Sequence, residues 1–536
     1  MRHIILLLCL GFGTNSYCKG ADNIPMIDSL INHSIEKKMF SGSVLVTKNN
    51  KVLYQKTYGL ANAESSRVID QKTSFNLSSL TRTLTTSCVL KLADQGKLNL
   101  GDEMRKFIPE YPFDGVTIKS FLQQNEGNNN EVQLRCSGNS AGNLSNYKAR
   151  NDAYNGEGTL LDNKCDFTNY NCSKEKYLND NYLMLAQIVE KASGETFKNY
   201  VHKNILTPCA MDNTYVNNVD TFTNKAIGYR YSYFTEQFTP YTNTFLEPAD
   251  ANIYSNCNDL LNFTNNYFSG KLISNEMVKE ATTSDNFIRA NRSIYGGISL
   301  ILLGFCLLSR PSKKGFLALA AISMIGGMTL TWSGFYNKKS EFRDFAMGWE
   351  KMIYNKEEVT YQTGNTGGAK NILWHENSGL NIIILSNSST CPNYALAKGI
   401  SNIVHDQPHQ VPSSPLAYIY CENLRKSGDV VETLRKTKQE WLKTDYINSK
   451  YNDEEEKINE LANELMSINK VPESIAAFNL GDMLQNKNLA KTDTYSDVLT
   501  ISGNTLNSMF SITNEENRVK LPENVMSQKM DNPIEN

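Results

Sequence analysis

One stretch of this 536-residue chain decides its fold: Phe75-Asn76-Leu77-Ser78-Ser79-Leu80-Thr81-Arg82-Thr83-Leu84-Thr85. Ser79 stands at the start of a predicted helix over residues 81–96, whose apolar stripe includes Leu84 and Leu92. A serine in this place ordinarily caps a helix or lies in its first turn. Because Arg82 follows one turn later, the segment also suits a serine nucleophile with a positive charge beside it.

Two segments later in the chain carry further candidate motifs. The first is a run that begins with Tyr177-Leu178-Asn179 and continues to Ala192-Ser193-Gly194. The second is Gly364-Asn365-Thr366-Gly367-Gly368. With the first stretch, these segments resemble the penicillin-recognising serine hydrolases, which include class C β-lactamases, D-Ala-D-Ala carboxypeptidases and related esterases. The resemblance covers about residues 26–389.

The resemblance implies an α+β fold of the β-lactamase/transpeptidase-like type, an antiparallel sheet flanked by helices, with a helical lobe. The residues agree with it. Residues 43–46 and 52–54 read as a hairpin around Asn49-Asn50, and residues 371–374 and 380–386 read as two further strands. Strands at both ends of this region with helices between them predict a sheet closed by strands that are distant in sequence.

The resemblance also implies roles for the site residues. Ser79 is the expected nucleophile, and Tyr177, assisted by Arg82, is the expected base. The backbone N–H of Ser79 is expected to contribute to the oxyanion hole. We expect substrate to be positioned by Asn179, Asn365, Thr366 and Gly367. No metal and no cofactor are expected.

Two positions depart from the family pattern and leave two functions open. Arg82 replaces a lysine, and an arginine stays protonated, so it cannot act as a general base. Asn365 replaces a lysine or histidine. One hypothesis is an acyl-transfer hydrolase acting on a peptidoglycan peptide, a β-lactam or a small ester. The other is a degenerate member that binds cell-wall material or scaffolds partners. For the single residues, the alternative roles are an ordinary packed aromatic for Tyr177 and a solvated or core-paired helix residue for Arg82.

Composition and the N-terminus favour an exported protein. Residues 1–20 have the layout of a cleaved signal peptide, with a short apolar run from Ile4 to Leu10. The polar segment around Cys136, Cys165 and Cys172 predicts one or two disulfides in an oxidising periplasm, with free thiols as the alternative. Net charge is −2 with no concentrated basic face, which argues against nucleic-acid binding.

Two apolar runs, residues 294–309 and 316–336, interrupt the middle of the chain around a basic turn. The second has the roughly 20 residues that cross a bilayer, and the first is marginal. We therefore expect residues 291–338 to form a transmembrane helical hairpin, with the hydrolase domain on the periplasmic side of the bacterial inner membrane. The alternative is a hairpin buried in the protein core.

The C-terminal part is expected to be a separate helical module. Ala462 and Ala477 suit the close approach of a tetratricopeptide-like helix pair, and a plain helical extension is the alternative. Such a short array needs support from the hydrolase domain or from a protein partner. The expected parts are a signal peptide (1–20), the hydrolase domain in two segments (21–290 and 339–412), the hairpin (291–338), the helical module (413–515) and a disordered tail (516–536).

Overall fold

The computed structural model describes residues 23–109, 111, 114–123, 174–216, 223–241, 253–283, 285–308, 322–331, 344–441 and 454–485. The chain divides into two compact units. The first takes residues up to 231 together with 238–412, and the second takes residues 232–237 together with those from 413 onward. The predicted signal peptide, the cysteines at 136, 165 and 172, and the predicted disordered tail lie outside the described residues. No disulfide joins the described cysteines.

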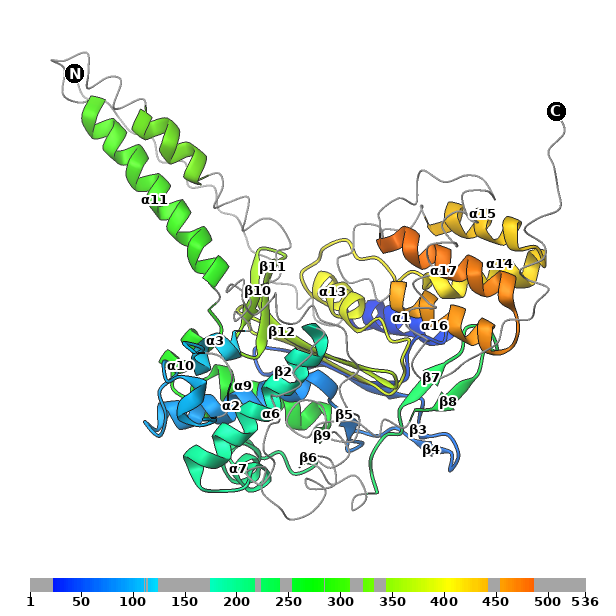
Figure 1. Ribbon diagram of the computed structural model, residues 1–536, viewed down its shortest axis with the longest axis horizontal. Helices are drawn as coiled ribbons and strands as arrows, with labels where there is room; N and C mark the ends of the chain where they lie inside the picture. Colours follow the sequence, from blue (N-terminus) through cyan, green and yellow to red (C-terminus); the bar gives the residue numbers. More distant parts are fainter. Residues whose placement is uncertain are drawn as a thin grey trace, which may run out of the picture. The chain divides into compact units, whose positions relative to one another are not determined.

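A seven-stranded antiparallel sheet forms the centre of the first unit (Figure 1). Its order is β10 (Asp344–Ala346), β11 (Trp349–Tyr354), β12 (Glu357–Thr366), β13 (Ala369–Glu376), β14 (Leu380–Ser386), β1 (Gly42–Lys48) and β2 (Lys51–Tyr58). Strand β1 pairs with β14 from Gly42 opposite Ser386 to Lys48 opposite Leu380. The sheet is thus closed by strands from the two ends of the domain, which confirms the predicted α+β fold.

The first hairpin of the sheet forms where its turn residues predict it. Strands β1 and β2 flank Asn49 and Asn50, whose φ angles are +50° and +63°. Turns with positive φ at both central residues match the right-handed twist of the strands, and asparagine tolerates this conformation better than most residues. The hairpin prediction is therefore confirmed.

Both faces of the central strands are buried, and their residues alternate between two cores. Leu45, Ile383 and Leu385 belong to the large apolar cluster shared with the helical lobe, whereas the equally buried Val44 and Ile384 do not. Figure 1 shows α1 (Asn23–Glu36) and α13 (Asn393–Val404) on one side of the sheet, and α9 (Cys257–Phe268) with the lobe on the other. The period-2 alternation of strand side chains produces this division.

The helical lobe is built around α2 (Thr81–Asp94) and α6 (Lys174–Ser193). Around them lie α3 (Ile118–Leu122), α7 (Phe197–Val201), α10 (Asn275–Ala281) and the short helical turns η3 (Met104–Lys106) and η6 (His202–Leu206). The small strands are β3 (Leu60–Asn62) with β4 (Arg67–Val68), β5 (Phe75–Asn76) with β9 (Ile253–Ser255) and β6 (Tyr215–Val216), and β7 (Tyr229–Tyr231) with β8 (Phe238–Pro240).

Helix α11 (Asp285–Leu308) and a second helical segment, residues 322–331, lie side by side (Figure 1). A Cβ on Gly297 would lie 2.5 Å from the carbonyl oxygen of Gly327, so the two backbones touch. Within the described ranges, no helix is both long and apolar enough to cross a membrane. The prediction of a transmembrane hairpin over 291–338 is therefore not supported. The 24 residues of α11 include Asp285, Arg289 and Arg292, which leaves an apolar remainder shorter than about 20 residues.

The second unit contains α14 (Leu416–Ser427), α15 (Val430–Trp441), α16 (Glu454–Ser467) and α17 (Val471–Gln485). Ala462 and Ala477 are fully buried, and the Ser474 hydroxyl donates to the Ala462 carbonyl oxygen at 2.6 Å. Small side chains therefore lie buried in both helices of the α16–α17 pair, as their spacing predicts. Repeat ancestry stays a prediction.

Candidate active site

The candidate nucleophile lies on a sharp junction between strand and helix. Strand β5 ends at Asn76, the short helical turn η2 (Ser78–Leu80) follows, and α2 begins at Thr81. Ser78 has a φ of +52°, a backbone conformation that residues other than glycine rarely adopt. Its N–H donates to Oδ1 of Asn76 at 2.8 Å, which fixes the bend. Ser79 comes directly after this bend and is partly exposed.

Strand β12 lies directly against this junction. A Cβ on Gly364 would lie 2.0 Å from the carbonyl oxygen of Leu77, so only glycine permits this approach. The Ser78 hydroxyl donates to the Asn365 carbonyl oxygen at 2.8 Å, and Asn371 Nδ2 donates to the carbonyl oxygen of Asn76 at 2.8 Å. The structure therefore brings the serine segment and the Gly364–Gly368 segment together, although nearly 300 residues separate them.

Arg82 lies on the first turn of α2, three residues after Ser79 and thus on the same side of the helix. Its guanidinium carbon lies 5.0 Å from the centre of the Tyr182 ring, a cation–π contact that links α2 to α6. Helix α6 is the element that carries Tyr177 and Asn179. The side chains of these two residues lie outside the described part, so their positions relative to Ser79 stay predictions.

The remaining predicted site residues lie at the end of β12. Asn365 is exposed, and its Oδ1 accepts a hydrogen bond from Asn393 Nδ2 at 3.1 Å. Thr366 ends the strand, and Gly367 forms the turn into β13 with Gly368. Both glycines are packed against Tyr241, because a Cβ on Gly367 would lie 2.5 Å from its ring.

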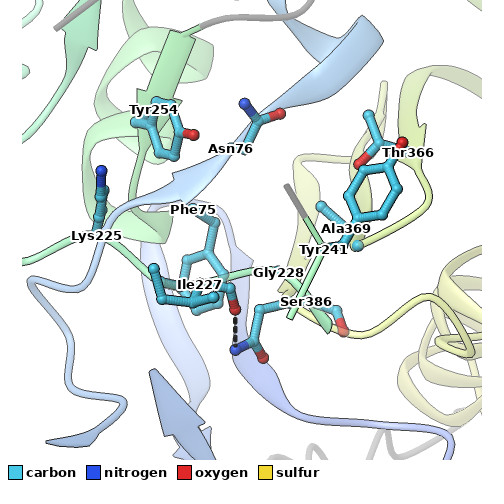
Figure 2. A pocket seen from close by; sticks show the side chains of 13 residues that line it. Phe75, Asn76, Lys225, Ile227, Gly228, Tyr241, Tyr254, Thr366, Ala369 and Ser386 are labelled. Atoms are coloured by element: carbon cyan, nitrogen blue, oxygen red, sulfur yellow. Dashed lines mark hydrogen bonds between the residues drawn. The ribbon is translucent and has the colours of Figure 1, made fainter. Parts of the chain in front are cut away.

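A pocket of about 190 Å³ opens beside this turn (Figure 2). It is lined by Phe75 and Asn76, residues 225–228, Tyr241, Tyr254, Thr366, Gly368, Ala369, Ser386 and Asn387. The only charged side chain among these lining residues is that of Lys225. Figure 2 shows the Tyr254 hydroxyl and the Asn76 amide turned toward each other. The pocket is thus bordered by Asn76, which is close in sequence to Ser79, and by Thr366 of the Gly364–Gly368 segment.

The pocket surface is mainly apolar, and no carboxylate side chain lines it. Burial raises the pKa of Tyr254, and the Asn76 side chain lowers it by less, so this phenol stays protonated at neutral pH. The floor is held by Asn387, whose Nδ2 donates to the carbonyl oxygens of Leu60 and Ile227, both at 2.9 Å. Nowhere in the described chain do three or more His, Cys, Asp or Glu side chains gather in a way that could hold a metal ion.

The sequence did not point to Lys225, Tyr241 or Tyr254, which line the pocket. They lie in short segments without a recognisable motif, so no local pattern distinguished them from ordinary surface residues. The consecutive glycines Gly367 and Gly368 were the available signal, since paired glycines after a strand indicate that another group packs closely there.

Comparison with known proteins gives one family and several relatives. The sequence matches the family described as Beta-lactamase over residues 27–129 and 167–387. Penicillin-binding protein 4* of Bacillus subtilis (strain 168) is 24% identical over 390 residues, which cover 71% of this chain and 76% of the relative. Protein flp of Staphylococcus aureus (strain MRSA252) is 28% identical over 217 residues, and these span 39% of this chain and 41% of that protein.

Among solved structures, the fold is similar to an octameric penicillin-binding protein homologue from Pyrococcus abyssi. The TM-score is 0.52 at 19% sequence identity, and the match covers 75% of this chain and 81% of the other. At this identity the likeness concerns the fold alone.

Proposed function

Because this chain belongs to the β-lactamase family of serine hydrolases, we propose that it catalyses acyl transfer through Ser79. The observation that carries the proposal is the partly exposed Ser79 on a bend that Ser78 ties directly to Asn365, with a pocket lined by Asn76 and Thr366 from the same two segments of chain. A nucleophile, a binding strand and a pocket are the parts that acyl transfer needs.

The proposed reaction has two balanced steps. The Tyr177 phenolate takes the proton of Ser79 as its Oγ attacks the substrate carbonyl carbon, and the leaving group departs with that proton. Water then attacks the acyl–serine ester and loses a proton to Tyr177. As the bond between the acyl carbon and Ser79 Oγ breaks, Tyr177 returns this proton to Oγ, which releases the acid and regenerates both Ser79 and the Tyr177 phenolate. The Ser79 N–H stabilises the oxyanion in both steps. Arg82 contributes positive charge that favours the phenolate. The proposed substrates are a peptidoglycan peptide, a β-lactam or a small ester.

A second candidate is a family member that binds such ligands without turning them over. The contact of Arg82 with the Tyr182 ring favours it, because this side chain has a packing role between α2 and α6. Arg82 replaces the lysine of a cooperating nucleophile–base unit. Loss of one member of such a unit lowers the rate by a factor on the order of 10⁴ to 10⁶.

Covalent labelling separates the two candidates. The full-length protein is treated with a fluorescent penicillin and with a fluorophosphonate, beside Ser79→Ala and Arg82→Lys. We expect labelling of the wild type that disappears in Ser79→Ala, and the preferred probe identifies peptidase-like or esterase-like chemistry. Labelling seen only in Arg82→Lys would establish the non-catalytic candidate. No labelling of either protein would overturn the proposal of a serine nucleophile.

We also propose that the protein acts at the periplasmic face of the bacterial inner membrane, with the helix pair of α11 and residues 322–331 in contact with lipid. Large apolar side chains are exposed on both helices: Tyr295, Ile298, Leu302, Leu303, Phe305, Ile322, Ile325, Met328 and Leu330. The hydroxyls of Ser299, Ser323, Thr329 and Thr331 all donate to backbone carbonyl oxygens of the pair. Internal satisfaction of polar groups is what an apolar surrounding demands.

Cosedimentation with anionic phospholipid vesicles tests the lipid contact. We expect the full-length protein to pellet with vesicles and the double variant Leu302→Ser/Leu303→Ser to pellet less. Val52→Ser, which alters an apolar side chain exposed on β2, is the matched control and is expected to behave like wild type. Equal pelleting of all three proteins, or none, would contradict the proposal.

A further inference from the structure

A buried asparagine on β13 reaches the stretch of chain just before Ser79. Asn371 is fully buried, and its Nδ2 donates to the carbonyl oxygen of Asn76 at 2.8 Å and to that of Leu77 at 3.3 Å. Its Oδ1 accepts a hydrogen bond from the N–H of Ser386, on β14, at 3.2 Å. One amide group therefore joins the end of β5 to two strands of the central sheet.

The partners of the Asn371 amide fix its orientation. A backbone N–H can only donate and a carbonyl oxygen can only accept, so Ser386 requires the oxygen of the amide and the bend requires its nitrogen. The carbonyl oxygen of Asn371 itself accepts a hydrogen bond from Asn393 Nδ2 at 2.7 Å, which holds the backbone of β13 at this point. The side chain is thus held both at its base and at its two polar atoms.

Gly364 leaves the space for this contact. It lies opposite Asn371 in the pairing of β12 with β13. Because Gly364 has no side chain, the Leu77 carbonyl oxygen lies only 2.0 Å from the point that a Cβ would occupy there. The Asn371 amide binds the same carbonyl oxygen from the next strand. The two paired residues have different tasks, since the glycine admits the bend and the asparagine binds it.

The hydrogen bonds continue from Asn76 toward the proposed nucleophile. Asn76 presents its backbone carbonyl oxygen to Asn371 and its side-chain Oδ1 to the N–H of Ser78, 2.8 Å away. On its other side the bend is held by β9, because the Leu77 N–H donates to the Ile253 carbonyl oxygen at 2.8 Å. The nucleophile comes directly after Ser78. The backbone that leads to it is therefore held from two sides, and Asn371 provides bonds on the side of the sheet.

We infer that Asn371 is a positioning residue for the acyl-transfer reaction. It acts through the carbonyl groups of Asn76 and Leu77, and it fixes the place of both the Ser79 hydroxyl and the Ser79 N–H. Misplacement of a reacting group by about 1 Å lowers a rate by about 100-fold, so a residue that holds the bend contributes to the rate without touching substrate. The inference rests on the proposed function for the reaction at Ser79, but the hold of Asn371 on the bend does not depend on turnover.

Two measurements on the full-length protein test the inference. Amide hydrogen exchange, followed by mass spectrometry, reports how readily the backbone of residues 76–80 opens. The time course of labelling with a fluorophosphonate, in which Ser79 Oγ bonds to phosphorus and fluoride leaves, gives the maximal rate constant kinact and the binding constant KI separately. Exchange measures the hold on the bend, and kinact measures its effect on the reaction.

Three variants are compared with the wild type. Asn371→Ala removes the whole amide. Asn371→Asp keeps the size of the side chain and the acceptor for the Ser386 N–H, but it replaces the donor by a carboxylate oxygen. Asn381→Ala is the matched control, because Asn381 is a buried asparagine at the other end of β14 whose amide contacts Thr47 and His375 instead of the bend.

We expect exchange over residues 76–80 to be about tenfold faster in both Asn371 variants, as the loss of these hydrogen bonds predicts, and unchanged in Asn381→Ala. In both Asn371 variants kinact should fall by about 10- to 100-fold while KI stays close to the wild-type value. A merely structural role would lower the melting temperature of the Asn371 and Asn381 variants alike and leave kinact unchanged. Wild-type exchange over residues 76–80, or a wild-type kinact, in Asn371→Ala overturns the inference. If Asn371→Ala does not fold, Asn371→Asp decides by the same criteria.

The proposed function and this inference fail in different ways. A wild type that is not labelled, with exchange that rises in Asn371→Ala, would remove acyl transfer and leave Asn371 as the residue that holds the bend. Labelling of Ser79 with exchange and kinact that do not depend on Asn371 would leave the enzyme and remove the role of Asn371.

Discussion

Ser78 combines a backbone cost with a hydrogen-bond gain at the bend before Ser79. Its φ of +52° costs about 1 kcal/mol relative to glycine. Its hydroxyl bond to the Asn365 carbonyl oxygen returns about 0.5–1.5 kcal/mol. The two effects are of similar size, so a serine holds this bend nearly as well as glycine would, and it adds a link to β12.

The two smallest substitutions at Ser78 should therefore differ. Ser78→Ala keeps the backbone cost and loses the hydrogen bond, so we expect it to lower the free energy of unfolding by about 1 kcal/mol. Ser78→Gly loses the bond but relieves the backbone, so it should lie within about 0.5 kcal/mol of wild type. Urea unfolding of the three proteins measures this order. Equal stability of the alanine and glycine variants would show that the strain argument is wrong.

His375 makes the stability of the sheet depend on pH. Its ring stacks on Phe268 with centroids 3.7 Å apart, and its Nδ1 lies 2.6 Å from Asn381 Oδ1. Burial lowers the pKa of His375, while Asn381 and the nearby Glu376 raise it by less. Below the ordinary imidazole pKa of 6.5, the unfolded chain therefore binds a proton that the folded chain does not. His375 stabilises the fold fully above pH 6.5, and this contribution is lost as pH falls below it.

We expect the free energy of unfolding to fall as the pH drops below 6.5, with a contribution from His375 of up to about 1.4 kcal/mol per pH unit. His375→Gln removes the titrating group, so its stability should decline less steeply over that interval. His202→Gln, a change at an exposed histidine, serves as the control and should keep the slope of the wild type. Denaturant unfolding at several pH values gives the three slopes, and identical slopes would refute the assignment to His375.

At the scale of elements, the approach of β12 to the serine segment depends on Gly364. Any Cβ there would lie 2.0 Å from the Leu77 carbonyl oxygen, and the atom it meets is backbone and cannot rotate away. The strand and the bend would have to move apart, which would also stretch the hydrogen bond from Ser78 to Asn365.

Gly364→Ala should lower the free energy of unfolding by about 1–3 kcal/mol, as overpacking at a tight contact does. It should also reduce covalent labelling of Ser79, because the bend and the strand no longer meet. Gly101→Ala is the matched control, since the nearest atom to its new Cβ is a side-chain oxygen of Asn99 at 3.2 Å. Thermal unfolding and labelling of both variants check this, and an unperturbed Gly364→Ala would contradict it.

At the scale of the whole molecule, the tip between β7 and β8 belongs to the helical unit. Within that unit Arg425 pairs with Glu236 at 2.7 Å and donates to the Tyr233 carbonyl oxygen at 3.2 Å. The Ser232 hydroxyl donates to Glu464. The strands that lead into this tip, β7 and β8, belong to the first unit. One continuous segment of chain is therefore shared by both units.

Arg425→Ala should release this tip locally. The ion pair is partly exposed, so we expect a loss of about 1 kcal/mol, or roughly fivefold faster amide exchange over residues 232–237. Exchange in β1 and β2 should stay unchanged, because they lie in the other unit. Lys426→Ala, which breaks only an ion pair with Glu422 on the same helix, is the control. Unaltered exchange at the tip in Arg425→Ala would show that Arg425 does not hold it.

The sequence by itself determined the features whose signals are local. The stretch from Phe75 to Thr85 indicated a serine at a helix start, and Asn49-Asn50 indicated the first hairpin, because turn and cap preferences act between residues a few positions apart. Order and spacing of the later motifs then indicated the family. The same local view predicted a membrane-spanning hairpin from the apolar runs at 294–309 and 316–336, whereas no helix among the described residues is long and apolar enough to cross a membrane.

Only the tertiary structure decided which distant residues meet. It placed Arg230 and Tyr241 against Gly367, tied Ser78 to Asn365, and assigned residues 232–237 to the helical unit. No sequence periodicity encodes such contacts. They depend on how the sheet pairs strands that are distant in the sequence, and on the close approach of other groups that each glycine permits. The sequence carries the types of the groups in this site, and the packing of the sheet and its loops decides which of them face one another.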